Sequence, residues 1–198
     1  MHLKLACLFF ATLLCSQNAF ASKSHTHDGF YLRLTPGVGG LNISDDNTEI
    51  SGGAGKFSLQ LGGSLSPDWI LFGEVASMMA QDPTLKVNGQ EIDTSDFDVT
   101  AGWTSAGIGA TRYWQSGTYI TFGARFPVLR FETKFNGQTN EAESDSGFSG
   151  FFAVGREWWV SENWGLGVGG EFEAGSVKED ENEINLGSVS IYFSATYH

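Results

Sequence analysis

The stretch WGLGVGGEFEAGSV, residues 164–177, alternates between two kinds of side chain. Its even positions are Trp164, Leu166, Val168, Gly170, Phe172 and Ala174, and its odd positions are Gly165, Gly167, Gly169, Glu171, Glu173 and Gly175. Successive side chains of a β-strand point to opposite faces, so a period of two is typical of a strand. The stretch therefore predicts a strand with one apolar face and one face of glycine and glutamate.

Nearly every long segment that follows residue 21 alternates in the same way, and almost none shows the 3.6-residue period of a helix. The connections between the segments alternate in length: residues 66–68, 115–117 and 161–163 form tight turns, and the other four connections are long and polar. We count eight segments, about Gly29–Ile43, Gly53–Leu65, Trp69–Ala80, Val99–Trp114, Thr118–Phe131, Gly147–Val160, Trp164–Val177 and Leu186–Tyr197.

An even number of antiparallel strands, with short turns at one end and longer loops at the other, is typical of outer-membrane proteins. We therefore expect an all-β fold, an eight-stranded antiparallel up-and-down transmembrane β-barrel. Two prolines within the expected strands, Pro36 and Pro127, must lie at bulges or where the ladder is already broken, because proline has no backbone N–H to donate.

The period does not say which face points outward, because a soluble lipocalin-like barrel that binds an apolar ligand alternates too, with its apolar face inside. The composition of the polar face favours the opposite orientation. It is mostly Gly, Ser and Thr with a few isolated charges, whereas the outside of a soluble barrel is rich in Lys, Glu and Asp. We expect the apolar face to contact lipid.

Aromatic residues lie within a few positions of the three tight turns. Indole rings favour the headgroup zone of a membrane, where both their apolar body and their polar N–H are satisfied. We therefore expect an aromatic girdle at the periplasmic interface, formed by Trp69, Tyr113, Trp114, Trp158, Trp159 and Trp164.

The strand count, the asymmetry of the loops, EWWVSENWGLGVGG (157–170) and the ending SVSIYFSATYH (188–198) resemble the small eight-stranded outer-membrane β-barrel proteins, the OmpA- and OmpX-like group. The resemblance covers the chain from residue 22 onward. It implies that the barrel-assembly machinery recognises the final strand, which ends at an aromatic residue. His198 follows Tyr197 and departs from that pattern.

The first 21 residues, MHLKLACLFFATLLCSQNAFA, have the features of a cleavable secretory signal: a lysine, an apolar run over residues 5–14 and a small-x-small ending at Ala19–Ala21. We expect residues 1–21 to be a signal peptide and residues 22–198 to be the outer-membrane β-barrel domain. Both cysteines, Cys7 and Cys15, fall in the signal, so the mature chain is expected to contain no disulfide and no thiolate metal site.

The net charge of −12 argues against a nucleic-acid partner, which requires a basic face. The expected partners are outer-membrane lipid and lipopolysaccharide, and the barrel-assembly machinery during biogenesis. We expect a monomer located in the cell outer membrane.

The charged residues of the polar face are expected to form a structural salt-bridge network, because an isolated ion in a narrow lumen is costly to desolvate. The alternative function for these residues is a gate that opens when pairs exchange. Eight strands enclose an interior that side chains can fill, which argues against a general diffusion pore. The residues of this expected network are Arg33, Lys56, Glu74, Arg125, Glu157, Glu171 and Glu173.

Catalysis requires a base, and the histidines beyond the signal, His25, His27 and His198, lie near the two termini, outside the expected barrel wall. We expect a tail at His25 and His27 rather than a His-x-His metal site. The sequence thus predicts a non-enzymatic protein without cofactor or metal. The long loops carry most of the acidic residues, which favours solvated loops; the alternative is that they collect divalent cations next to lipopolysaccharide phosphates.

These observations predict an integral outer-membrane barrel with a structural, envelope-integrity or surface-interaction role. The alternatives are a narrow gated channel that uses the lumen charges, and a secreted soluble lipocalin-like binder of an apolar ligand.

Overall fold

The computed structural model describes residues 27, 29–92, 98–135, 138–179 and 182–198. The expected signal peptide and His25 lie outside the described residues. Among the described residues, no helix is long and apolar enough to cross a membrane. The strands are β1 (Phe30–Leu34), β2 (Gly37–Ser44), β3 (Thr48–Ser66), β4 (Trp69–Gln81), β5 (Thr84–Val87), β6 (Gln90–Ile92), β7 (Asp98–Tyr113), β8 (Thr118–Phe135), β9 (Gln138–Ser146), β10 (Phe148–Trp159), β11 (Trp164–Glu179) and β12 (Asn182–Tyr197).

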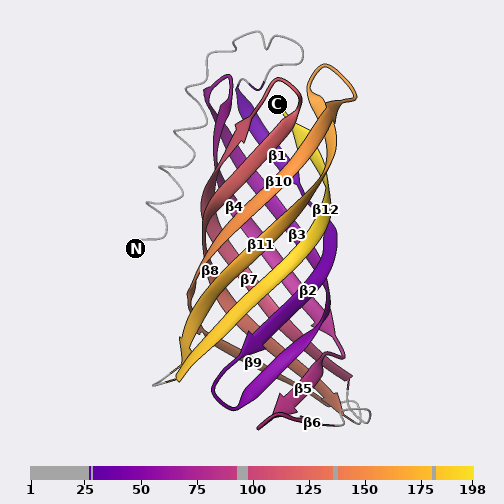
Figure 1. The fold of residues 1–198 in the computed structure, drawn as a ribbon, viewed down its shortest axis with the longest axis vertical. Helices are drawn as coiled ribbons and strands as arrows, with labels where there is room; N and C mark the ends of the chain where they lie inside the picture. The colour runs from indigo at the N-terminus through magenta and orange to yellow at the C-terminus, as the bar shows by residue number, and fades with distance from the viewer. Residues whose placement is uncertain (1–26, 28, 93–97, 136–137, 180–181) are drawn as a thin grey trace.

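The strands form one antiparallel sheet that closes on itself as a ring of eight. Around the ring, β12 is followed by β11, β10, β8, β7, β4 and β3, and β3 pairs with β1 and β2, which also pair with β12 and so close the barrel. Figure 1 shows the strands tilted around the barrel, with β5, β6 and β9 gathered at the end opposite the C-terminus. The predicted eight-stranded antiparallel barrel is confirmed.

The three predicted tight turns connect β3 to β4, β7 to β8 and β10 to β11. We call the end of the barrel that carries them the turn end, and the opposite end the hairpin end. In the β7–β8 turn, the amide of Trp114 donates to the carbonyl of Thr118 over 2.9 Å, and Gly117 adopts a positive φ of 76° that favours glycine. Short turns of this kind face the periplasm in outer-membrane barrels.

Both prolines lie where the sheet is interrupted, as the sequence predicted. Pro36 separates β1 from β2, so the expected first strand is two strands with a break. The break is bridged on both sides, because the amide of Thr35 donates to the carbonyl of Ser58 over 3.0 Å and the amide of Phe193 donates to the carbonyl of Pro36 over 2.9 Å.

Pro127 lies inside β8, and its carbonyl accepts a hydrogen bond of 2.8 Å from the amide of Gly147, the residue that separates β9 from β10. The register of β8 against β9 shifts at the next residues, between Val128 and Arg130. The interruption of one wall strand is therefore matched by an interruption in its neighbour.

The long connections are not loops throughout, which corrects the sequence prediction. Much of each connection continues the ladder: β11 pairs with β12 out to Glu179 opposite Asn182, and β8 pairs with β9 out to Phe135 opposite Gln138. The β5–β6 hairpin turns through Asn88 and Gly89, whose φ angles of 52° and 77° suit the two-residue turn that matches strand twist.

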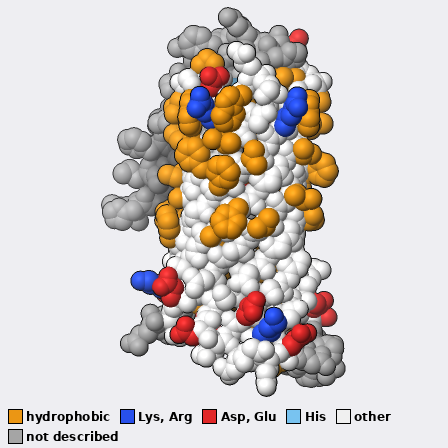
Figure 2. Space-filling view, in the orientation of Figure 1, with side chains coloured by type: hydrophobic (Ala, Val, Ile, Leu, Met, Phe, Trp, Pro, Cys, Tyr) orange, Lys and Arg blue, Asp and Glu red, His pale blue; other side chains and the backbone are white. Residues whose placement is uncertain are grey.

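The outer surface of the barrel is apolar, which confirms the predicted orientation. Phe193 is 71% exposed, whereas Arg125 on the opposite face of the sheet is 1% exposed. Figure 2 shows the hydrophobic side chains gathered over the half of this face nearer the turn end, with some charged side chains among them and more charged side chains near the other end. Other exposed apolar side chains include Leu166, Phe172, Val189 and Ile191.

A closed barrel with a broad apolar exterior is stable against hydrocarbon, because its backbone groups are all paired within the wall and its exterior requires no water. The prediction of a soluble lipocalin-like binder is therefore wrong. Such a protein would place its apolar side chains inside and its charged side chains outside.

Candidate functional site

The seven charged residues predicted for the lumen are all buried inside the barrel, and the structure gathers them into two groups. One group, nearer the middle of the barrel, surrounds Arg125. The other, nearer the turn end, surrounds Arg33 and Glu157. Together they place three cations opposite four carboxylates: Arg33, Lys56 and Arg125 opposite Glu74, Glu157, Glu171 and Glu173.

The Arg125 group joins three carboxylates to one guanidinium. Arg125 holds Glu74 through two hydrogen bonds, from Nε over 3.1 Å and from Nη2 over 2.9 Å. Its Nη1 donates to Glu171 over 2.8 Å and to Glu173 over 2.6 Å. The guanidinium lies 3.9 Å from the ring centroid of Phe151. Because β4, β8 and β11 supply the charged residues, the group connects distant parts of the wall across the lumen.

Lys56 brings a second cation to this group. Its Nζ lies 2.6 Å from Glu171 Oε2, an ion pair without hydrogen-bond geometry. It also lies 4.5 Å from the ring centroid of Tyr192. Beside Lys56 and Arg125 the lumen contains a cavity of about 10 Å³, which is close to the smallest space that holds one water molecule. The middle of the barrel is therefore filled by side chains.

The second group is centred on Glu157 of β10. Arg33 Nη2 lies 2.7 Å from Glu157 Oε1 and also contacts the hydroxyl of Tyr113. Tyr113 donates to Glu157 Oε2 over 2.8 Å, and Thr196 donates to Oε1 over 2.6 Å. Ser194 adds a further hydrogen bond of 3.0 Å to Oε1. These donors replace water around a buried carboxylate.

Two tyrosines connect the groups. The hydroxyls of Tyr119 and Tyr192 lie 3.1 Å apart, and the Arg33 guanidinium lies 4.2 Å from the ring centroid of Tyr119. Since Lys56 lies over the ring of Tyr192, aromatic rings fill the space between the cations of the two groups. Sequence reasoning missed this role, although the two tyrosines share the inward-facing parity of the charges.

The turn end of the lumen is covered by both ends of the barrel chain. His198 is 4% exposed, and its Nε2 lies 3.8 Å from Glu157 Oε2. The ring of His27 stacks on Tyr113 with centroids 3.7 Å apart, and its Nδ1 lies 3.2 Å from His198 Nδ1. The prediction that these two histidines lie outside the barrel wall is wrong. Burial of aromatic ring surface against the lumen residues accounts for their position.

The structure places the six residues predicted for the aromatic girdle on both faces of the wall. Tyr113, the last residue of β7, is buried and points into the lumen, whereas the next residue, Trp114, is exposed, because successive side chains of an extended chain alternate. Trp159 also turns inward, with its ring 5.0 Å from that of His198. The residues of the predicted girdle that lie on the outer surface at the turn end are Trp69, Trp114, Trp158 and Trp164.

The hairpin end of the lumen contains an apolar cluster that sequence reasoning missed. Its centre is Trp103, 1% exposed, and Leu129, and the chain contributes to it from β2, β3, β4, β7, β8, β11 and β12. The sequence contained a sign of this cluster, because Leu41 and Ile43 occupy odd positions like Arg33 and therefore face the lumen as Arg33 does. The other buried members are Ala54, Met78, Ala80, Val177 and Leu186.

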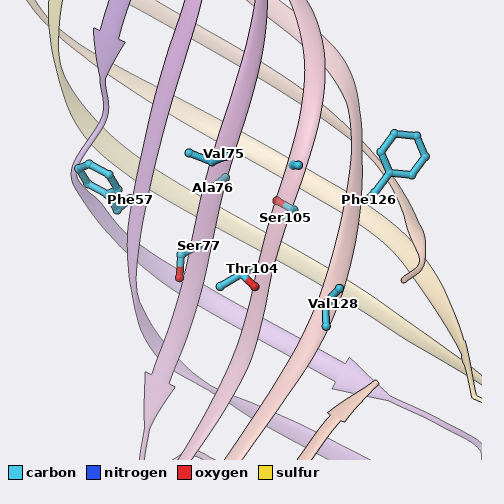
Figure 3. A pocket seen from close by; sticks show the side chains of 9 residues that line it. Phe57, Val75, Ala76, Ser77, Thr104, Ser105, Phe126 and Val128 are labelled. Atoms are coloured by element: carbon cyan, nitrogen blue, oxygen red, sulfur yellow. The ribbon is translucent and has the colours of Figure 1, made fainter. Parts of the chain in front are cut away.

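Two surface depressions lie outside the lumen. A shallow groove of about 470 Å³ on the outer wall has Phe57 at one side and Phe126 and Val128 at the other, with Val75 between them (Figure 3). A polar cleft of about 400 Å³ at the hairpin end lies between the β2–β3 turn and the β5–β6 hairpin. The charged residues that line the cleft are Asp45, Asp46, Glu49 and Lys86.

Within the described part of the chain, no cluster of three or more His, Cys, Asp or Glu side chains is arranged to hold a metal ion. Among the acidic residues of the expected loops, Asp93, Asp96, Asp180 and Glu181 lie outside the described residues. Others lie on strands of the hairpin end, and Glu143 on β9 pairs with Arg130 over 2.8 Å.

This architecture is similar to that of several solved protein structures. Neisserial surface protein A has a TM-score of 0.51 and 17% sequence identity, over 85% of this chain and 96% of its own. The fold is that of the small outer-membrane β-barrels. No protein-family model matches the chain, and no curated protein matches its sequence.

Two further small barrels are similar at lower scores. The Yersinia pestis attachment invasion locus protein Ail has a TM-score of 0.47 and 12% identity, over 84% of this chain and 99% of its own. The Escherichia coli outer membrane protease OmpT has a TM-score of 0.49 and 9% identity, over 92% of this chain and 99% of its own. A shared fold does not by itself assign a function.

Proposed function

We propose that this protein is an integral outer-membrane barrel with a closed lumen, which serves envelope integrity or surface interaction and is not an enzyme. The observation that carries the proposal is that the lumen is filled in two layers. The Arg125 group occupies the middle, and the Trp103 cluster occupies the hairpin end.

The two layers oppose conduction for different reasons. In the charged layer, Arg125 is held by three carboxylates at once, so an ion that passes would have to displace several short hydrogen bonds. In the apolar layer, an ion would lose its hydration against Trp103 and Leu129. A gate that exchanges pairs in the charged layer would still leave the apolar layer closed, which favours the structural role over the channel.

The surface for interaction is the hairpin end, where β5, β6 and β9 extend the wall beyond the apolar exterior (Figures 1 and 2). The neighbouring part of β8 carries charged side chains in ion pairs there: Arg130 pairs with Glu143 of β9, and Lys134 pairs with Glu132. The proposed partners are outer-membrane lipid and lipopolysaccharide, with the barrel-assembly machinery acting during insertion. The protein is proposed to act as a monomer.

Planar-bilayer recording of the refolded protein tests the closed lumen. We expect no discrete conductance steps from the wild type or from the Arg125→Ala variant. The matched control is Trp103→Ala, which opens only the apolar layer and is expected to remain closed because the Arg125 group is intact. Steps in the wild type that disappear or change size in Arg125→Ala would establish the gated channel instead.

Cell fractionation combined with heat-modifiable gel mobility tests the membrane location. We expect the protein in the outer-membrane fraction, with faster migration before boiling than after, because a closed barrel resists detergent unfolding. Recovery in the soluble fraction would contradict the proposal.

A further inference from the structure

The triplet Arg-x-Trp occurs twice in the chain, as Arg112–Trp114 and as Arg156–Trp158. The central residues of the two triplets, Tyr113 and Glu157, face the lumen and are joined there by the 2.8 Å hydrogen bond. The residues on either side of them therefore point outward, at the same end of the barrel. The lumen contact shows that the two triplets lie at a similar height in the wall.

The two arginines flank a single strand on the outer surface. Arg112 is paired with Ile120 of β8, and Arg156 is paired with Thr118 of the same strand. Two strand spacings and an offset of two residues separate their Cα atoms, which corresponds to about 12 Å. Since paired residues of antiparallel strands point to the same face, both guanidinium groups can reach a ligand that lies over β8.

Each guanidinium lies beside the indole rings of the girdle. Arg112 lies 5.3 Å from the ring centroid of Trp114 and 5.7 Å from that of Trp69. Arg156 lies 5.5 Å from the ring centroid of Trp158. Both arginines are exposed, and basic side chains lie within the hydrophobic surface at this end of the barrel in Figure 2. A long basic side chain at this position extends to the headgroup level.

The two arginines of the triplets differ from Arg130 in their ion pairing. Among the described residues, no carboxylate lies within 4.0 Å of either guanidinium, whereas Arg130 at the hairpin end pairs with Glu143. A chain of net charge −12 thus presents, on one outward-facing patch, two cations that form no ion pair with the described carboxylates. A ligand that matches this patch has an anionic head and apolar chains.

We propose that Arg112 and Arg156, with Trp69, Trp114 and Trp158, bind the headgroup phosphate of an anionic phospholipid in the periplasmic leaflet. The proposal rests on the proposed insertion into the outer membrane. The two guanidinium groups donate to the phosphate, the indoles border the headgroup, and the acyl chains lie along the apolar surface over β8. Two cations favour a headgroup with a net negative charge over a zwitterionic one.

Native mass spectrometry of the refolded protein tests this site. The protein is released from detergent micelles that contain equal amounts of phosphatidylglycerol and phosphatidylcholine, and the retained lipid is identified. We expect the wild type to retain phosphatidylglycerol preferentially. Replacement of each arginine by glutamine should weaken retention about fivefold, and the double variant Arg112→Gln/Arg156→Gln about 30-fold. The control variant Arg130→Gln is expected to behave as the wild type.

The possible results distinguish a failure of the lipid site from a failure of the proposed function. Equal retention by the wild type and a folded, membrane-inserted double variant would overturn the site and leave the insertion intact. A wild type that does not insert into bilayers would overturn the proposed function itself. Displacement of the lipid by an equal concentration of inorganic phosphate would overturn the assignment to a phospholipid, since the patch would then bind phosphate alone.

Discussion

At the scale of single residues, Arg125 joins three carboxylates inside the lumen. It donates to Glu74, Glu171 and Glu173 while 1% of its surface is exposed. A buried ion pair adds little net stability when it forms, because desolvation opposes the attraction between the charges. Removal of one partner is costly, because the charges that remain have lost both water and their counter-ion.

We therefore predict that Arg125→Ala lowers the free energy of unfolding by about 3–5 kcal/mol. Urea unfolding of the refolded barrel in detergent, followed by tryptophan fluorescence, measures the change. The control is Arg130→Ala, which removes an exposed ion pair with Glu143 and should cost less than about 1 kcal/mol. Equal unfolding midpoints for the two variants would show that the Arg125 group does not stabilise the barrel.

At the scale of strands, glycine on the lumen face makes room for the aromatic rings inside. Gly155 of β10 and Gly169 of β11 are paired in the sheet, and the ring of Tyr119 lies over the first and that of Tyr192 over the second. A Cβ at Gly169 would lie 2.6 Å from Cζ of Tyr192. Within the opening stretch, Gly169 is thus small because a ring from another strand occupies the space above it.

Gly169→Ala is predicted to destabilise the barrel by about 1–3 kcal/mol, because the tyrosine must leave its position in a filled lumen. The matched substitution is Gly55→Ala on β3, where a Cβ would meet nothing within 4 Å. That variant should be neutral or more stable by up to about 1 kcal/mol, since alanine loses less conformational freedom on folding. Thermal unfolding of both variants in the same detergent compares them, and a larger loss for Gly55→Ala would contradict the packing described here.

At the scale of the whole molecule, the closed wall separates two environments. Side chains of one parity contact the surroundings, and side chains of the other parity fill the lumen. The tryptophans report on both, because Trp158 is 49% exposed on the outer surface and Trp103 is 1% exposed inside.

Lipid quenching should distinguish these two tryptophans. In variants that retain a single tryptophan, phospholipids with brominated acyl chains are expected to quench the fluorescence of Trp158 strongly and that of Trp103 weakly, because the quencher acts only at close range. A soluble quencher such as acrylamide provides the control for water access to Trp103. Stronger lipid quenching of Trp103 than of Trp158 would reverse the assignment of the two faces.

The sequence by itself determined the architecture of the barrel wall. A period of two has a physical cause in the geometry of each strand, so strand number, tight turns, the lipid-facing side and the breaks at Pro36 and Pro127 were all accessible from local pattern. The seven lumen charges were identified for the same reason, since parity assigns a face to every residue of a strand.

Only the tertiary structure decided which inward-facing residues meet. Partners such as Arg33 and Glu157 are far apart in the chain and come together through strand tilt and register, which no local pattern contains. The same closure turned Tyr113 from an expected girdle residue into a lumen residue and brought His198 over the turn end. Alternation along a strand is a local property, whereas contact across a lumen depends on the curvature of the whole sheet.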